Sequence, residues 1–196
     1  RELVADTQTP VSAYLRLAAG SRNTFLLESV EGGEIRGRFS VIGLSPDLIW
    51  RCRGSVAEIN RDPANSGEFS ADSRAPIDSL RALMAESAMA DTENLPPMSA
   101  GLFGYFGYDM IRHIEAIPDA NPAVIDTPDS MLVRPSLIAI FDRLKDSITF
   151  VVQVRPAEWN EPQAAWSHTQ DRIAAALDAL NAVSYTHLRA HETARH

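Results

Sequence analysis

The strand-like segments of this chain follow one another in adjacent pairs, and this order constrains the fold more than any other feature of the sequence. One pair is 24–31 with 36–46, the hairpin 48–60 follows it, and a third pair joins 131–141 to 147–154. Short turns join antiparallel neighbours, whereas parallel strands need long crossover connections. The sequence therefore predicts an α+β fold, an antiparallel hairpin-rich sheet with flanking helices, rather than a doubly wound parallel sheet.

Local signals predict where these strands turn and end. We expect the segment 36–46 to be broken at Gly43 and ended by Pro46, and the next hairpin to turn at Gly54. The segment 99–115 is predicted as a strand that runs into a glycine-punctuated bend and then a helical turn from Asp109, and 61–75 is predicted as a loop. The residues of the hairpin expected to face inward are Leu48, Trp50, Val56 and Ile59.

Three helices are expected beside these strands. The first begins at Thr9-Pro10, a hydroxyl cap followed by proline, and Gly20 is its expected stop. The second covers 76–90 and the third about 161–182. The residues that recur at helical spacing, and are predicted to face the core, are Val11, Tyr14, Leu15, Ala18, Ile77, Leu80, Leu83, Met84, Ala165, Ile173, Leu177 and Leu180.

Charge and composition narrow the class of function. The formal charge is −8, and no basic stripe is present, so nucleic acid and anionic membrane surfaces are poor partners. No apolar run approaches the length of a membrane span and no signal peptide is visible, so a cytoplasmic protein is expected. The single cysteine, Cys52, cannot form an internal disulfide. Arg51 and Arg53 could lower its pKa, but without a nearby histidine a structural role is favoured.

The last fourteen residues differ from the rest of the chain. Residues 183–196 follow a regular helix abruptly, lack apolar periodicity and hold three of the five histidines. His187 and His191 are spaced to share a helix face and bind a metal. However, the string VSYTHLRAHET resembles the translation of a sequencing-library adapter. We therefore interpret 183–196 as read-through rather than native sequence, and restrict fold reasoning to 1–182.

Residues 1–182 contain no catalytic constellation. Gly101, Gly104 and Gly107 lack the spacing of a phosphate-binding loop, so close backbone packing beside aromatic residues is the favoured interpretation. The segment TFLLESV raises a different question, because Glu28 and Ser29 end an apolar run. Strand alternation places Leu27 and Ser29 on one face and Glu28 on the other. Either this strand lines a pocket with a polar end, or Glu28 pairs with Arg36 or Arg38 and Ser29 is merely a strand end.

Three separated motifs resemble anthranilate synthase component I, a family of chorismate-utilising synthases. They are FLLES, GRFSVIGLSPDLIW and GLFGYFGYDMIRHIE, and the opening RELVADTQTPVSAYLRL is also similar. The resemblance implies that 1–182 is the amino-terminal regulatory region of that fold, truncated at both ends. Aminodeoxychorismate synthase component I shares this architecture, so the folate-branch enzyme stays open as an alternative, as does an amino-acid-binding module without catalysis.

The resemblance also implies an activity and a site. The complete enzyme would convert chorismate and ammonia to anthranilate and pyruvate with Mg²⁺, taking ammonia from a glutamine amidotransferase partner, and L-tryptophan would inhibit it. The chorismate and Mg²⁺ residues would lie beyond Ala182, so no catalytic or metal residue is expected in this chain. Phe39 stands where the family more commonly has tyrosine, which removes a hydroxyl. The implied tryptophan-binding residues are Leu27, Glu28, Ser29, Arg38, Phe39 and Ser40.

Overall fold

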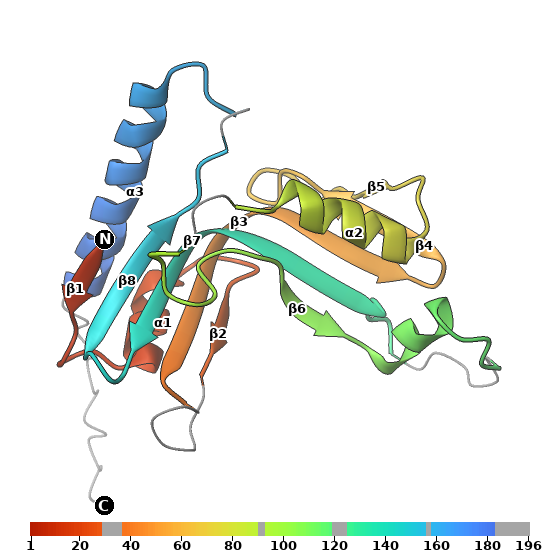
Figure 1. Cartoon of the computed structure of the whole chain (residues 1–196), viewed down its shortest axis with the longest axis horizontal. Coiled ribbons are helices and arrows are strands. Elements are labelled where there is room, and N and C mark those ends of the chain that lie inside the picture. Colours follow the sequence, from red (N-terminus) through yellow and green to blue (C-terminus); the bar gives the residue numbers. More distant parts are fainter. Residues whose placement is uncertain (29–36, 90–92, 119–124, 156–157, 183–196) are drawn as a thin grey trace, which may run out of the picture.

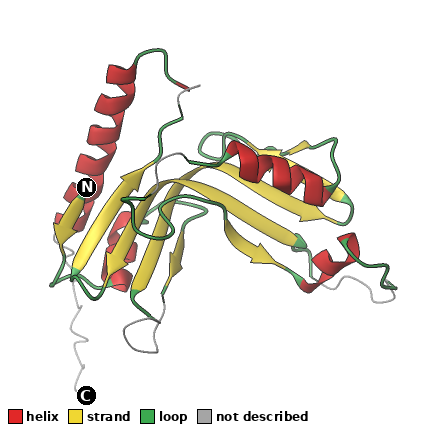
Figure 2. Cartoon of the chain, viewed as in Figure 1, coloured by secondary structure: helices red, strands yellow, loops and turns green. Residues whose placement is uncertain are grey.

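A computed structural model describes residues 1–28, 37–89, 93–118, 125–155 and 158–182. In this part of the chain one antiparallel sheet runs in the order β1-β8-β7-β3-β4-β5, with β2 paired to β3 and β6 to β7 (Figure 1). Helices lie against the sheet (Figure 2), which confirms the predicted α+β class. The strands are β1 (Glu2–Val4), β2 (Phe25–Leu27), β3 (Phe39–Arg53), β4 (Val56–Asn60), β5 (Ser70–Ala71), β6 (Phe103–Phe106), β7 (Ser130–Asp142) and β8 (Ser147–Val152).

The helices begin where the sequence predicts and end earlier in two cases. The Thr9 side chain accepts from the Ser12 N–H at 3.1 Å and Ser12 caps Thr9 in return, so α1 starts as expected. Its last residue lies before Gly20, and α2 stops before residue 90. The helices are α1 (Pro10–Leu17), α2 (Pro76–Glu86) and α3 (Pro162–Asn181), with a 3₁₀ helix η1 (Tyr108–His113) after β6.

The long antiparallel pair β3–β7 spans the sheet, and the break predicted within β3 is absent. Gly43 faces Phe25 on β2, whose ring lies where a Cβ would be, so an aromatic side chain covers the glycine. Pro46 pairs with Pro135, and the register then shifts before Leu48. Two residues of β3 thus oppose one step of β7, and this bulge lets the strand continue past its proline.

The sheet carries cores on both faces. Side chains alternate along β7, so Leu137 and Phe141 face one side, whereas Leu132 and Ile138 face the other. Leu137 and Phe141 pack in a cluster with α1 and α3, and Leu132 packs with Trp50 and α2. Figure 1 shows α2 in front of the sheet at one end and α1 behind it at the other. A third cluster lies around Val41, Ile138, Ile140 and Val151.

Several predicted core positions are wrong. Val56 and Met84 are exposed, and Ala57 is buried where Val56 was expected; Leu80 and Leu83 of α2 are buried as predicted. In α1, Val11 and Leu15 are exposed because the helix turns Ala13, Tyr14 and Leu17 toward the core; Ala18 packs there too. The predicted faces of α3 and of Leu48, Trp50 and Ile59 are confirmed. The segment 61–75 contains the short strand β5 and is not a loop throughout.

The tail interpreted as read-through, with His187 and His191, lies outside the described residues. Within the described ranges, none of the helices combines the length and the apolar character needed to cross a bilayer.

Candidate functional site

The residues predicted to bind tryptophan lie where β2 meets the beginning of β3. Leu27 pairs with Val41, and Phe39 is the next residue along β3 on the same face. Leu27 is 49% exposed, whereas Val41, its partner on the neighbouring strand, is fully buried. Phe25 shares this face and stacks on Phe103 with ring centroids 4.8 Å apart. Register and strand alternation therefore put Leu27 and Phe39 on the same face of the sheet as Val41 and Phe25.

A paired guanidinium lies beside that surface. Arg38 donates Nε to Asp142 Oδ1 at 2.8 Å and Nη2 to Oδ2 at 2.6 Å, and its Cζ lies 4.8 Å from the centroid of the Phe39 ring. These bonds lower the pKa of Asp142, which also accepts from the Leu144 N–H. A bidentate pair holds the guanidinium in one orientation. Its remaining N–H donors are thereby positioned at the edge of the apolar face.

Glu28 pairs with a different arginine from the one considered at first. Its carboxylate accepts from Arg143 Nη2 at 2.9 Å, and Arg143 follows the end of β7. Arg38 is committed to Asp142, so a Glu28–Arg38 pair is wrong. Arg36 and Ser29 lie outside the described residues.

Ser40 is separated from Leu27 and Phe39 by the sheet. It pairs with Phe141, and strand alternation places it on the face covered by α1 and α3. Ser40 is fully buried, and its hydroxyl has no hydrogen-bond partner in the described part of the chain. A ligand lying on Leu27 and Phe39 would not touch the Ser40 side chain without a rearrangement of β3.

The glycine motif packs against backbone. A Cβ on Gly104 would lie 1.9 Å from the Met131 carbonyl oxygen, and one on Gly107 would lie 2.6 Å from that of Asp129. Close approach of β6 to β7 therefore explains both glycines, as the sequence interpretation held, whereas a Cβ on Gly101 would meet no backbone.

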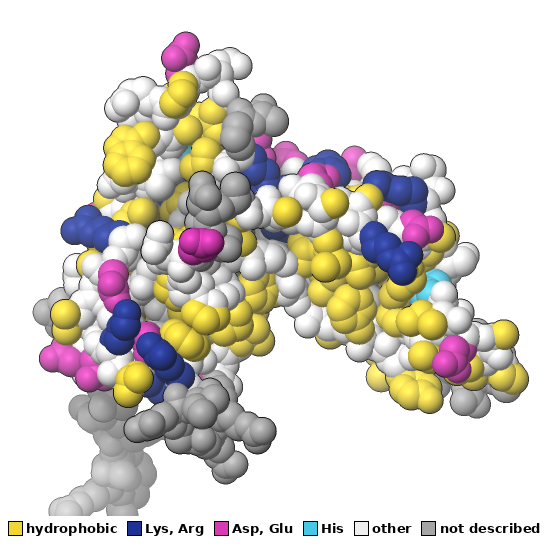
Figure 3. Space-filling model, in the orientation of Figure 1, with side chains coloured by type: hydrophobic (Ala, Val, Ile, Leu, Met, Phe, Trp, Pro, Cys, Tyr) yellow, Lys and Arg dark blue, Asp and Glu magenta, His cyan; other side chains and the backbone are white. Residues whose placement is uncertain are grey.

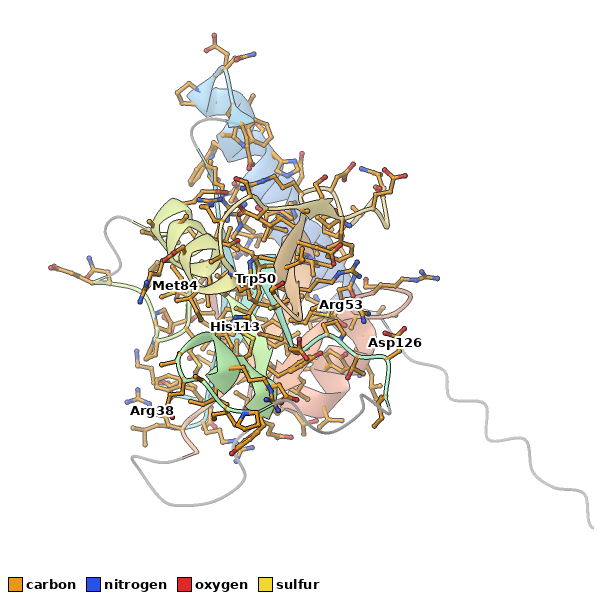
Figure 4. All side chains as sticks on the ribbon, turned by 90° about the vertical axis from the view of Figure 1, so that its right-hand side faces the viewer. Arg38, Trp50, Arg53, Met84, His113 and Asp126 are labelled. Carbon is orange, nitrogen blue, oxygen red and sulfur yellow. The ribbon has the colours of Figure 1, made fainter. Side chains whose placement is uncertain are left out.

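Cys52 is a buried structural residue, and its flanking arginines do not activate it. Burial raises the pKa of the Cys52 thiol to about 11, with Asp129 adding to the effect. Arg51 pairs with Glu58 and Arg53 with Asp126 (Figure 4). His113 Nε2 lies 3.5 Å from Sγ, a contact that the sequence did not indicate because the two residues are far apart along the chain. A thiol with so high a pKa is a poor nucleophile.

The arrangement fits a zwitterionic ligand with an apolar side chain. Phe39 offers an apolar surface and Arg38, beside its ring, offers donors for a carboxylate. Glu28 could accept from an ammonium only by turning toward this face from Arg143. Among the described residues, no group of three or more His, Cys, Asp or Glu side chains is placed to hold a metal ion.

Comparisons with known proteins identify what the chain is similar to. No protein-family model matches it. It is 45% identical over 180 residues to anthranilate synthase component 1 of Cereibacter sphaeroides, a match that covers 91% of this chain and 36% of that protein. The Thermus thermophilus protein of the same name is 35% identical over 170 residues, 85% of this chain and 34% of its own length.

A solved structure shares the fold. The crystal structure of anthranilate synthase component I from Streptococcus pneumoniae superposes with a TM-score of 0.56 at 23% identity, over 91% of this chain and 36% of that one. The chain thus spans about a third of the length of the proteins it matches. In sequence and in fold, it is a relative of anthranilate synthase component 1 and corresponds to one part of that protein.

Proposed function

We propose that this chain is the amino-terminal regulatory part of an anthranilate synthase component 1 and that it binds L-tryptophan. The observation that carries the proposal is 45% identity across 91% of the chain, together with the apolar face edged by charges at β2 and β3. The complete enzyme would convert chorismate and ammonia to anthranilate and pyruvate. Its ammonia would come from glutamine through an amidotransferase partner, and tryptophan would inhibit it.

The physical argument concerns the charges of a free amino acid. Burying an ammonium and a carboxylate without partners costs several kcal/mol. Arg38 lies against the Phe39 ring and could pair with the ligand's carboxylate, and the ring is suited to stack against an indole. Glu28, which strand alternation places on the other face, would have to turn from Arg143 to meet the ammonium. The ligand's charges would then join existing ion pairs rather than be stripped of water. We keep Ser29 and Ser40 as candidate contacts, the latter through its unpartnered hydroxyl.

Catalysis is proposed to reside elsewhere in the parent enzyme. The described residues offer no metal-holding group, and the Cys52 thiol, although it lies 3.5 Å from His113 Nε2, is buried with its pKa raised to about 11. We therefore place the chorismate and Mg²⁺ sites in the portion of the relatives that this chain does not match, and we expect no synthase activity from the chain alone. Inhibition would then require that tryptophan bind the active and inactive states with different affinities.

A chimera tests the proposal. Residues 1–182 replace the matching segment of the Cereibacter sphaeroides protein, which is co-expressed with its amidotransferase, and product formation is followed with and without tryptophan. Anthranilate formation that tryptophan inhibits would support the proposal. The catalytic part of the chimera comes from the host, so its response to tryptophan is what reports on residues 1–182. A folded chimera that forms anthranilate equally well with and without tryptophan would refute the regulatory assignment.

Substitutions within the chimera test the site. We expect Arg38→Gln to weaken tryptophan inhibition at least tenfold, since it removes the cation beside Phe39. Arg81→Gln, on the exposed side of α2, is the matched control and should leave inhibition unchanged. Equal inhibition of the two variants would show that tryptophan does not bind at β2 and β3.

A further inference from the structure

A second concave site lies away from β2. It is a cleft of about 1580 Å³ between α3, the bulge of β3, the end of β8 and the end of α2. In Figure 3 the surface is notched between the part that rises with α3 and the part built on α2. We call it the arginine cleft, after Arg61, Arg134, Arg155 and Arg172, which line it.

Three of these arginines share two carboxylates. Arg134 donates Nε to Asp47 at 2.9 Å and Nη1 to Glu86 at 3.0 Å, and its side chain is 4% exposed. Arg155 also pairs with Asp47. Arg61 donates Nη1 and Nη2 to the two carboxylate oxygens of Glu86, each at 2.8 Å.

The bulge explains the position of the shared acid. Asp47 is the extra residue of β3 at the register shift, so the irregularity aims its carboxylate at Arg134 and Arg155.

Arg172 has no carboxylate of its own. In the described part of the chain it makes one hydrogen bond, in which Nη1 donates to the Ser136 hydroxyl oxygen at 2.9 Å. The same hydroxyl donates its own hydrogen to the Ser45 carbonyl oxygen. Burial lowers the pKa of the Arg172 guanidinium, and only Asp47 opposes the effect. The group nevertheless stays charged in a protein. A partly buried cation with free donors therefore faces the cleft.

The local charge is opposite to that of the whole chain. The chain carries a net charge of −8, yet the less exposed charged groups of the cleft are the guanidinium groups of Arg134, Arg155 and Arg172 against the carboxylate of Asp47. The other charged groups that line the cleft are exposed, and they are two arginines and three acids: Arg22, Arg61, Asp62, Glu86 and Glu158. A low-dielectric recess with an excess of one sign attracts small ions of the other sign.

We propose that the arginine cleft binds the phosphate group of a small dissolved molecule, held between Arg172 and Arg155. Guanidinium groups bind phosphate oxygens through paired N–H donors, and Arg172 has such donors unused. The cleft is far larger than one phosphate, so the rest of the molecule would lie toward its rim. This site shares no residue with the tryptophan site, and it does not depend on the proposed function.

The test titrates the full chain with inorganic phosphate and with pyrophosphate. Sodium chloride keeps the ionic strength constant, and binding is followed by the unfolding midpoint and by calorimetry. We expect a saturable rise of the midpoint with both anions in the unmodified chain and in Arg81→Gln, whose side chain lies outside the cleft. Arg172→Gln should weaken phosphate binding at least tenfold.

Stability and binding can be separated in the same experiment. Without phosphate, Arg172→Gln should unfold at the same or a higher midpoint, since it removes a desolvated charge that lacks an acid partner. A lower midpoint would mean that Arg172 is structural, and Arg155→Gln then replaces it as the binding variant. The proposal is overturned if the unmodified chain shows no saturable effect beyond that of chloride, or if both cleft variants bind phosphate as Arg81→Gln does.

Discussion

Replacing Ser79 with alanine should lower the stability of the fold, because the Ser79 hydroxyl joins α2 to the sheet. The Trp50 indole is fully buried, and its Nε1–H donates to Ser79 Oγ at 3.0 Å. The hydroxyl in turn donates to Asp72 Oδ2 at 2.7 Å. Asp72 keeps its bonds to Arg74 when Ser79 is removed, but the indole N–H loses its partner and has no access to water. The variant therefore orphans one buried donor.

The magnitude follows from that orphaned group. A buried donor left unsatisfied costs about 1–3 kcal/mol, so we expect Ser79→Ala to lower the free energy of unfolding by about 2 kcal/mol. With a urea m-value of about 2 kcal/mol/M, the midpoint falls by about 1 M. Far-ultraviolet circular dichroism during urea unfolding measures this shift without relying on Trp50 emission.

Two controls make the test specific. Ser167→Ala removes a serine hydroxyl from an exposed position of α3 and should change stability by less than about 0.5 kcal/mol. In a Trp50→Phe background no N–H remains to be orphaned, so Ser79→Ala should cost at least about 1 kcal/mol less there. Equal midpoints for Ser79→Ala and Ser167→Ala, or the same cost in both backgrounds, would refute the reasoning.

Three further predictions concern the strand contact at β6, the single thiol and the pH dependence of stability. Gly104→Ala drives a Cβ into the Met131 carbonyl and should cost about 1–3 kcal/mol or detach β6, whereas Gly67→Ala meets open space and should be neutral in the same urea assay. Cys52 should react with a disulfide reagent far more slowly in the folded chain than in guanidinium chloride, because burial raises its pKa to about 11; equal rates would contradict this. Arg61, and after it Arg134, lower the pKa of Glu86 from 4.5 to about 2, so its ionised form stabilises the fold above pH 4.5 and this contribution is lost as the pH falls toward 2. Glu86→Gln should flatten the fall of the urea midpoint in that window, and the exposed control Glu115→Gln should not.

The strand pairs and helix starts could be predicted because their signals are local. Alternation and short turns identify the β7–β8 hairpin, and the cap at Thr9 involves only Ser12, three residues away. The buried face of α3 follows from its own periodicity, with Ala165 and Ile173 buried as expected.

The errors concern features that distant segments decide. β1 is a strand because Glu2 to Val4 pair with β8. Three residues carry too short a pattern to predict a strand whose partner lies so far along the chain. β3 continues through Gly43 because Phe25 covers it, and a glycine alone predicts a break. Leu83 and Met84 are neighbours on a short helix and both were predicted to face the core, but only Leu83 is buried, since the way α2 lies on the sheet decides how wide its buried face is.

The candidate site was only partly predictable for the same reason. Strand alternation correctly separates Leu26, which packs in the cluster with α1 and α3, from Phe25, which packs on the other face. The acceptor of Arg38 is Asp142, the last residue of β7, and the partner of Glu28 is Arg143, which follows it in the turn to β8. Their signal was the short charged connection after β7, but no local rule assigns it to β2 and β3.

The β3–β7 pair also bears on how the chain folds as it is synthesised. Ser40 pairs with Phe141, so closing this pair brings together segments that leave the ribosome far apart in time. The β3–β4 hairpin can close early, but the other edge of β3 stays open until β7 has been translated. Non-local pairing of this kind slows folding, and an apolar open edge invites association with other chains. Refolding from urea should therefore have one slow phase, in which the clusters on both faces of β3 form together, and its yield should fall as protein concentration rises.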